Sequence, residues 1–168
     1  MHQAGHDIRT LGVHDSQDRP RPAAVADDVV CTVGENALVD NQKLCRLSVS
    51  DSEVELAGPP AALRDLGWLL RQSADGVEVA IAGGAVVQEH TAGPLIVSLR
   101  DAATLHLSGG NKYLDIVWDA LDGVAEQAEA AEDREVNRHQ HIEYFPGDEY
   151  RSPDCVPLVI VADWPDPA

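Results

Sequence analysis

The pattern of hydrophobic and polar positions divides residues 44–99 into short strands around one helix. Residues 44–50 and 54–57 alternate apolar and polar side chains on either side of an Asp-Ser-Glu turn, which is typical of a hairpin. In residues 61–73 leucines recur at steps of three and four, which predicts an amphipathic helix with one face on a sheet. Residues 77–81 alternate again and predict a strand that ends at a Gly-Gly pair.

A second stretch, residues 94–163, has the same order of predicted elements. Its longer helix begins near Tyr113 and runs into the Ala/Glu-rich segment 126–134, whose residue types favour helix. Residues 94–99 are almost continuously apolar and are counted in both stretches, which predicts a central strand covered on both faces. The other strands predicted in this stretch are residues 104–107, 139–145 and 156–162.

Matching residues in the two stretches indicate an internal duplication. Trp68 and Trp118 each follow an aspartate by three residues within the predicted helices. The other matching segments are Val54–Gly58 with Leu105–Gly109, and Pro94–Val97 with Pro157–Ile160. Positions that the copies share, including the tryptophans, are expected to be structural. Function is expected where the copies differ, in the segment His139–Tyr150 and in the longer second helix.

The predicted fold class is therefore α+β. It consists of two tandem β-β-α-β-β units, in about residues 44–99 and 94–163, that form one antiparallel or mixed sheet with two helices packed on one face. Residues 27–168 are expected to be a single globular domain, and the aperiodic residues 1–26 a flexible leader. Two short apolar runs within residues 29–39 predict a further hairpin or pair of edge strands.

Acidic residues dominate the charge of the chain. The sequence has 29 Asp and Glu against 12 Lys and Arg, for a net charge of −17. A field of that sign repels nucleic acid and anionic lipid and steers basic molecules toward the protein. We therefore expect a basic protein partner, no nucleic-acid partner and no membrane partner.

Two further features bear on the cellular compartment. No apolar run approaches the roughly 20 residues that cross a bilayer, and the first residues lack the layout of a secretion signal. The 3 cysteines are widely spaced and contain no C-x-x-C pair, which disfavours a disulfide framework and a thiolate zinc site. These features predict a cytoplasmic protein.

A histidine-rich segment is the strongest candidate for metal chemistry. His139, His141 and Glu143 alternate along a predicted strand, so that their side chains project from one face. Two imidazoles and a carboxylate are a suitable ligand set for zinc, nickel or iron. Same-face residues of a strand more often form a solvated polar row, so a polar interaction face is the favoured interpretation, and partly buried structural histidines are the other alternative.

Signatures of enzymes are weak in this chain. The loop 108–112 follows a strand and opens a helix, but it lacks the spacing of a phosphate-binding loop and is interpreted as a turn with a helix cap. His141-Ile142-Glu143 lacks the cysteine pair that zinc deaminases place downstream. No serine or cysteine nucleophile signature is evident. We therefore expect a protein that is not an enzyme and has no cofactor.

Two C-terminal segments carry a resemblance to a known family. The segments are His139-Gln140-His141-Ile142-Glu143-Tyr144-Phe145 with Tyr150, and Ser152-Pro153-Asp154-Cys155-Val156-Pro157-Leu158-Val159-Ile160. Together with the Leu105–Gly109 strand and the helix after it, they resemble the immunity-protein thirty-two family of bacterial polymorphic toxin systems. The resemblance covers residues 103–162. It implies a non-enzymatic cytoplasmic protein that binds and neutralises a toxin domain, often through an acidic surface.

Charge and resemblance lead to one hypothesis, an immunity-type inhibitor of a basic toxin or effector that is monomeric or homodimeric. A metal-binding module or metal-dependent enzyme that uses the His139, His141 and Glu143 face is the first alternative. A structural or oligomerising protein that pairs a sheet edge with a second copy is the other. The expected partner-binding residues are His139, His141, Glu143, Tyr144, Asp148, Glu149 and Tyr150.

Overall fold

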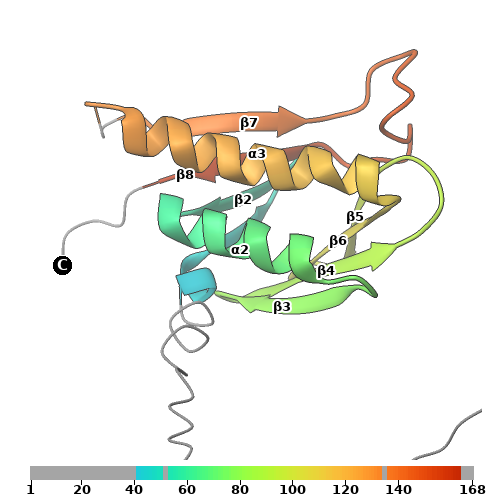
Figure 1. The fold of residues 1–168 in the computed structure, drawn as a ribbon, viewed down its shortest axis with the longest axis horizontal. Coiled ribbons are helices and arrows are strands. Elements are labelled where there is room, and N and C mark those ends of the chain that lie inside the picture. The colour runs from blue at the N-terminus through green and yellow to red at the C-terminus, as the bar shows by residue number, and fades with distance from the viewer. Residues whose placement is uncertain (1–40, 51–52, 134–135, 164–168) are drawn as a thin grey trace, which may run out of the picture. The chain divides into compact units, whose positions relative to one another are not determined.

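The computed structural model describes residues 41–50, 53–133 and 136–163, which form an α+β fold (Figure 1). This class, and the two helices expected within it, are confirmed. The leader expected at residues 1–26 and the hairpin expected within 29–39 lie outside the described residues. In the described part of the chain no helix is long and apolar enough to cross a membrane.

The element bounds follow the predicted pattern closely in the helices and less closely in the strands. The helix α3 ends at Ala130, so the Ala/Glu-rich segment contributes only its first part. The helical elements are η1 (Gln42–Leu44), α2 (Pro60–Gln72) and α3 (Asn111–Ala130). The strands are β1 (Arg46–Val49), β2 (Val54–Gly58), β3 (Val77–Ile81), β4 (Gly84–His90), β5 (Ile96–Asp101), β6 (Thr104–Gly109), β7 (Arg138–Ile142) and β8 (Leu158–Ala162).

The strands form two mixed four-stranded sheets, so the prediction of one continuous sheet is wrong. Sheet A has the order β1-β2-β8-β7, and sheet B has the order β3-β4-β6-β5. Each sheet joins one hairpin from each half of the chain through a central parallel pair, β2 with β8 and β4 with β6. Hydrophobic periodicity identifies strands but does not encode which distant strands pair, and this exchange of hairpins was therefore not foreseen.

The strand β4 was missed by the sequence analysis, and β5 lies at an edge instead of the predicted centre. Gly83 has a φ of 75° and Gly84 opens β4, so the Gly-Gly pair turns the chain into a hairpin instead of ending the strand. The apolar run of β5 is explained by its surroundings, because its inner face joins the core and its outer edge bonds to the loop before β8.

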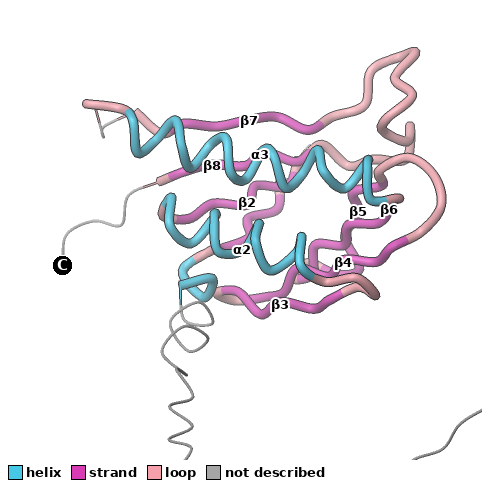
Figure 2. Tube along the Cα trace, in the orientation of Figure 1, coloured by secondary structure: helices cyan, strands magenta, loops and turns pink. Residues whose placement is uncertain are grey.

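Both helices lie on the same side of the strands, as predicted (Figure 2). They run antiparallel, because Arg64 near the start of α2 bonds to Glu129 near the end of α3, and Arg71 bonds to Asp119. Gly67 allows the close approach, since a Cβ there would lie 3.3 Å from Leu121 Cβ. The core between helices and sheets contains mainly Leu, Val and Ala from α2, α3 and the inner sheet faces.

The two tryptophans have different environments, so the expectation of a shared structural role is wrong for Trp68. Trp118 is only 4% exposed and donates its indole N–H to Gln88, whereas Trp68 is 46% exposed. The duplication itself stays a prediction. Its match of Pro94–Val97 with Pro157–Ile160 equates an edge strand with the central strand β8, which the topology does not support.

Candidate partner-binding face

The histidine-rich segment forms β7, the outermost strand of sheet A (Figure 1). The strand pairs antiparallel with β8, with His139 opposite Val161 and His141 opposite Val159. Directly opposed residues share a sheet face, so both histidines lie on the face away from the main core, beside the small apolar cluster of Ala57, Val159 and Val161. Their rings meet edge to face with centroids 5.3 Å apart.

The structure gives no support to the metal-site alternative. The strand ends at Ile142, so Glu143 lies outside the regular alternation that would align it with His139 and His141. In the described ranges no group of three or more His, Cys, Asp or Glu side chains is arranged to hold a metal ion. The two exposed histidines are therefore a polar surface pair.

The segment between β7 and β8 is organised by Asp148. Its carboxylate accepts hydrogen bonds from the backbone N–H of Tyr150 at 2.8 Å and of Arg151 at 3.3 Å, and from Arg151 Nη1 at 2.6 Å. The bond from Arg151, followed by the backbone bond from Tyr150, holds the pKa of Asp148 below its usual range. Its side chain is only 8% exposed. Of the residues expected to contact a partner, Asp148 is thus the one whose hydrogen bonds hold the loop in its shape.

The same loop is tied to the outer edge of β5. Leu95 N donates to Tyr150 O at 2.9 Å, Ser152 N donates to Leu95 O at 2.8 Å, and Val156 N donates to Val97 O at 2.9 Å. The half-buried thiol of Cys155 adds a bond to Leu95 O at 3.1 Å, and burial raises its pKa. These bonds give the loop a defined shape without regular secondary structure.

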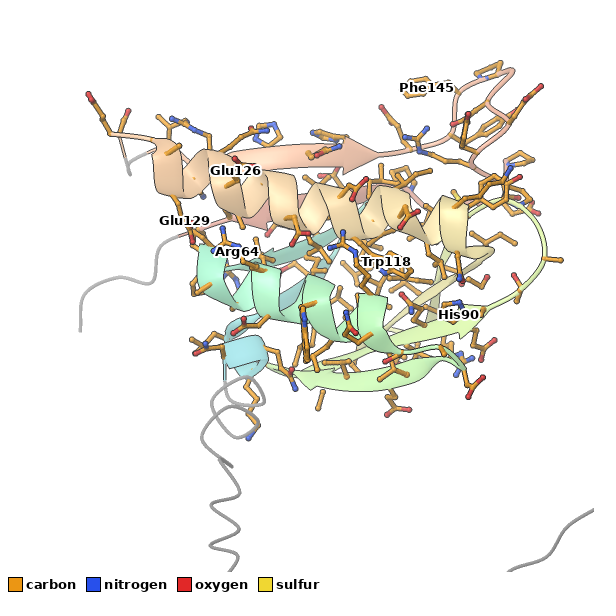
Figure 3. The ribbon with its side chains drawn as sticks, viewed as in Figure 1. Arg64, His90, Trp118, Glu126, Glu129 and Phe145 are labelled. Atoms are coloured by element: carbon orange, nitrogen blue, oxygen red, sulfur yellow. The ribbon has the colours of Figure 1, made fainter. Side chains whose placement is uncertain are left out.

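Two aromatic side chains are exposed on this loop. Phe145 is 58% exposed and Tyr150 is 56% exposed. The Tyr150 ring packs edge-on against Tyr113 with centroids 6.1 Å apart, and Lys112 Nζ lies 4.4 Å from the Tyr113 ring centroid. Figure 3 shows Phe145 on the loop beyond the end of β7, away from the helices. Phe145 was not among the expected contact residues, although its position before Pro146-Gly147 signals an exposed turn.

The remaining expected residues surround these aromatics in the sequence and differ in exposure. His139, His141 and Glu149 are exposed, whereas Glu143 and Tyr144 are half-buried. We call β7 and the loop 143–157 that follows it the β7 face.

The lengthened helix α3 carries a row of acids, at steps of three and four, toward α2 and solvent. Arg64 forms two 2.7 Å hydrogen bonds with Glu129, and Figure 3 shows these two residues side by side. Arg71 bonds to Asp119 at 3.1 Å and to Asp122 at 2.9 Å. These bonds link the helices and neutralise part of the row. Its members are Asp115, Asp119, Asp122, Glu126 and Glu129.

A second polar cluster, on sheet B, was not foreseen. His106 Nδ1 lies 3.4 Å from Ser98 Oγ, and its Nε2 lies 3.3 Å from Glu89 Oε2. The arrangement has the residue types of a catalytic triad, but the Nε2 atom has no hydrogen bond of good geometry and Glu89 is ion-paired with Arg100. The bond to Arg100 is the main cause of the lowered pKa of Glu89. We therefore interpret the cluster as a polar surface network around the ion pair of Glu89 and Arg100.

The comparison with protein families bears on the C-terminal half of the fold. Residues 104–163 match the family model of Immunity protein 32. The match runs from β6 through α3 and β7 to the end of β8, includes the whole β7 face, and confirms the resemblance seen in the sequence. Comparisons with curated proteins and with solved structures find no match. The family match supports an immunity-type role, which implies a toxin partner.

Proposed function

We propose that this chain is a non-enzymatic immunity protein that binds a basic toxin or effector domain in the cytoplasm and blocks its activity. The observation that carries the proposal is the match of residues 104–163 to an immunity-protein family. The net charge of −17 supports the basic character of the partner, because opposite charges speed association and disfavour wrong partners.

The β7 face is the surface that we assign to the partner. Phe145 and Tyr150 supply the exposed aromatic area that typically contributes most to binding energy at interfaces. Glu143 and Glu149 supply acidic groups beside them, and His139 and His141 extend the surface along β7. Tyr144 supports the loop from its half-buried position, and Asp148 sets the loop shape.

The test is binding of the purified full chain to the protein encoded by the neighbouring gene, measured by stopped-flow or surface-plasmon-resonance kinetics at low and at high salt. We expect a complex whose association rate falls as salt rises, because the charge attraction is screened. The absence of any complex at low salt would reject the proposal.

A matched pair of variants localises the interface. The double variant Phe145→Ala/Tyr150→Ala is expected to weaken binding by about 100-fold, since each aromatic anchor contributes about 1–2 kcal/mol or more. Trp68→Ala removes a comparably exposed aromatic from α2 and should leave the affinity unchanged. Equal losses of affinity in both variants would show that the partner does not bind specifically at the β7 face.

A further inference from the structure

The four sheet edges are bonded to other parts of the chain to different extents, since the edges of β1 and β3 meet at a single bridge and the edge of β5 is covered. Arg46 in β1 pairs with Ala82 just after β3, and Ala82 N donates to Cys45 O at 2.8 Å. The outer edge of β5 bonds to the loop 150–156. Within the described ranges, the backbone of residues 138–142 bonds only to β8, so the outer edge of β7 has unpaired N–H and C=O groups.

The strand is short and carries the charged Arg138, but it lacks the other features that protect an edge from pairing. Proline, a bulge, lysines or a cover normally block such edges. The 5 residues of β7 contain no proline and no lysine, and they follow β8 in an unbroken register. By contrast, β5 is covered and has a register shift between Leu99 and Asp101. The free edge of β7 is therefore geometrically able to accept another strand.

The charges around this edge favour a strand from a basic partner over a second copy of this chain. Each copy carries a net charge of −17, so self-pairing brings two strongly acidic bodies together. Glu143 directly follows the strand, and Glu149 lies in the loop beyond it. An extended segment with Lys or Arg at the end beside Ile142 would meet these acids, whereas its other end would lie beside Arg138. Phe145 provides a side-chain contact beyond the same end of the strand.

We propose that the outer edge of β7 binds an extended strand of the toxin partner, which adds a fifth strand to sheet A. This inference rests on the proposed function and specifies its binding mode. In strand addition the backbone supplies the hydrogen bonds and side chains adjust selectivity. Binding should therefore depend on the backbone N–H groups of β7 more than on its side chains.

Hydrogen exchange on the wild-type chain tests the edge directly. The full chain is compared alone and in complex with an inactivated form of the protein encoded by the neighbouring gene. We expect the amides of alternate residues within 138–142 to exchange at least ten-fold more slowly in the complex, while β3 is unchanged. A complex that leaves all β7 amides unprotected would overturn the strand-addition proposal and leave the proposed function standing. The absence of a complex would instead reject the proposed function.

Proline substitutions test whether binding depends on the backbone N–H groups of β7 or on its side chains. Successive strand residues direct their N–H groups to opposite edges, so Gln140→Pro and His141→Pro remove one outward and one β8-facing donor. Loss of a β8-facing N–H should lower the temperature of the thermal transition, whereas loss of an outward N–H should not. The variant that keeps the wild-type transition temperature has therefore lost the outward donor, and it should bind the partner at least ten-fold more weakly. The variant Gln140→Ala, which removes a side chain of β7 but keeps its backbone N–H, should retain binding within about three-fold. Loss in the alanine variant without loss in the folded proline variant would overturn the proposal. If both proline variants unfold, the exchange result on the wild-type chain decides.

Sedimentation of the chain alone tests whether a second copy of the chain, instead of the toxin, pairs with β7. We expect a monomer at micromolar concentration. A dimer that the folded proline variant dissociates would show that β7 pairs with a second copy, and it would overturn the assignment of this edge to the toxin.

Discussion

The indole Nε1 of Trp118 donates a 2.8 Å hydrogen bond to Oε1 of Gln88, and both side chains are buried. The amide nitrogen of Gln88 in turn donates to Leu70 O at 2.8 Å. One side chain of β4 thereby bonds to both helices. The same amide nitrogen lies 3.2 Å from His90, whose other ring nitrogen lies 2.6 Å from Asn111 Oδ1 at the start of α3.

Replacing Gln88 by leucine should destabilise the protein strongly. The change leaves the Trp118 N–H and the Leu70 carbonyl without this partner, and each unsatisfied buried group costs about 1–3 kcal/mol. We expect the free energy of unfolding to fall by about 2–4 kcal/mol, measured by urea denaturation. Gln72→Leu makes the same change at an exposed site and should stay within about 0.5 kcal/mol. A similar small effect for Gln88→Leu would show that the network contributes little.

A pair of glycine substitutions should have opposite effects on stability. A Cβ at Gly84 would lie 2.0 Å from Ala103 O, a backbone atom, so Gly84→Ala should lower the free energy of unfolding by about 2 kcal/mol or more. Gly123 lies inside α3 with no atom within 4 Å of its added Cβ. Gly123→Ala should raise stability by about 0.5–1 kcal/mol, because glycine is costly inside helices. Thermal unfolding of the two variants provides the measurement.

The order of the loop 143–157 should depend on pH through Asp148. Its pKa is lower in the folded protein than in the unfolded chain, mainly because of the bond from Arg151. The stabilising effect is therefore complete above the unfolded value of about 3.9 and is lost as pH falls through that value and the folded pKa. We expect the amides of Tyr150 and Arg151 to lose exchange protection in this acid range, after correction for the intrinsic pH dependence of exchange.

The variant Asp148→Asn should show weakened protection of these amides already at pH 7. Asp154→Asn, at an exposed position of the same loop, serves as the control and should behave like the wild-type chain. Full protection in Asp148→Asn at pH 7 would show that the charge on Asp148 is not needed for the loop shape.

The thiol of Cys45 should be unreactive in the folded protein. Burial is the main cause that raises its pKa to about 12, and the nearby carboxylates of Asp163 and Asp65 add to the shift. In the unfolded chain the thiol ionises near pH 8.5, so its contribution to stability is present below that pH and declines above it. In a Cys31→Ser variant, a thiol reagent at pH 8 should label Cys45 only after denaturant is added. Rapid labelling under native conditions would contradict the buried position.

The sequence identified which residues belong to the β7 face but not how their side chains are arranged. The alternation from His139 to Glu143, the nearby aromatics and the family resemblance all singled out residues 139–150. The hydrogen bonds that Asp148 accepts from Tyr150 and Arg151, and the bonds that tie residues 150–156 to Leu95 and Val97, were not evident from the sequence.

By itself, the sequence determined the local structure and the resemblance of the C-terminal part to an immunity-protein family. Periodicity located both helices and most strands, since hydrophobic spacing reports which face of an element is buried. Only the tertiary structure decided that hairpins from the two halves pair into two sheets, that β5 is covered, and that the outer edge of β7 is unpaired within the described ranges. It also decided that Trp118 is buried while Trp68 is exposed. These features depend on hydrogen bonds and packing between residues distant in sequence, which local spacing does not encode.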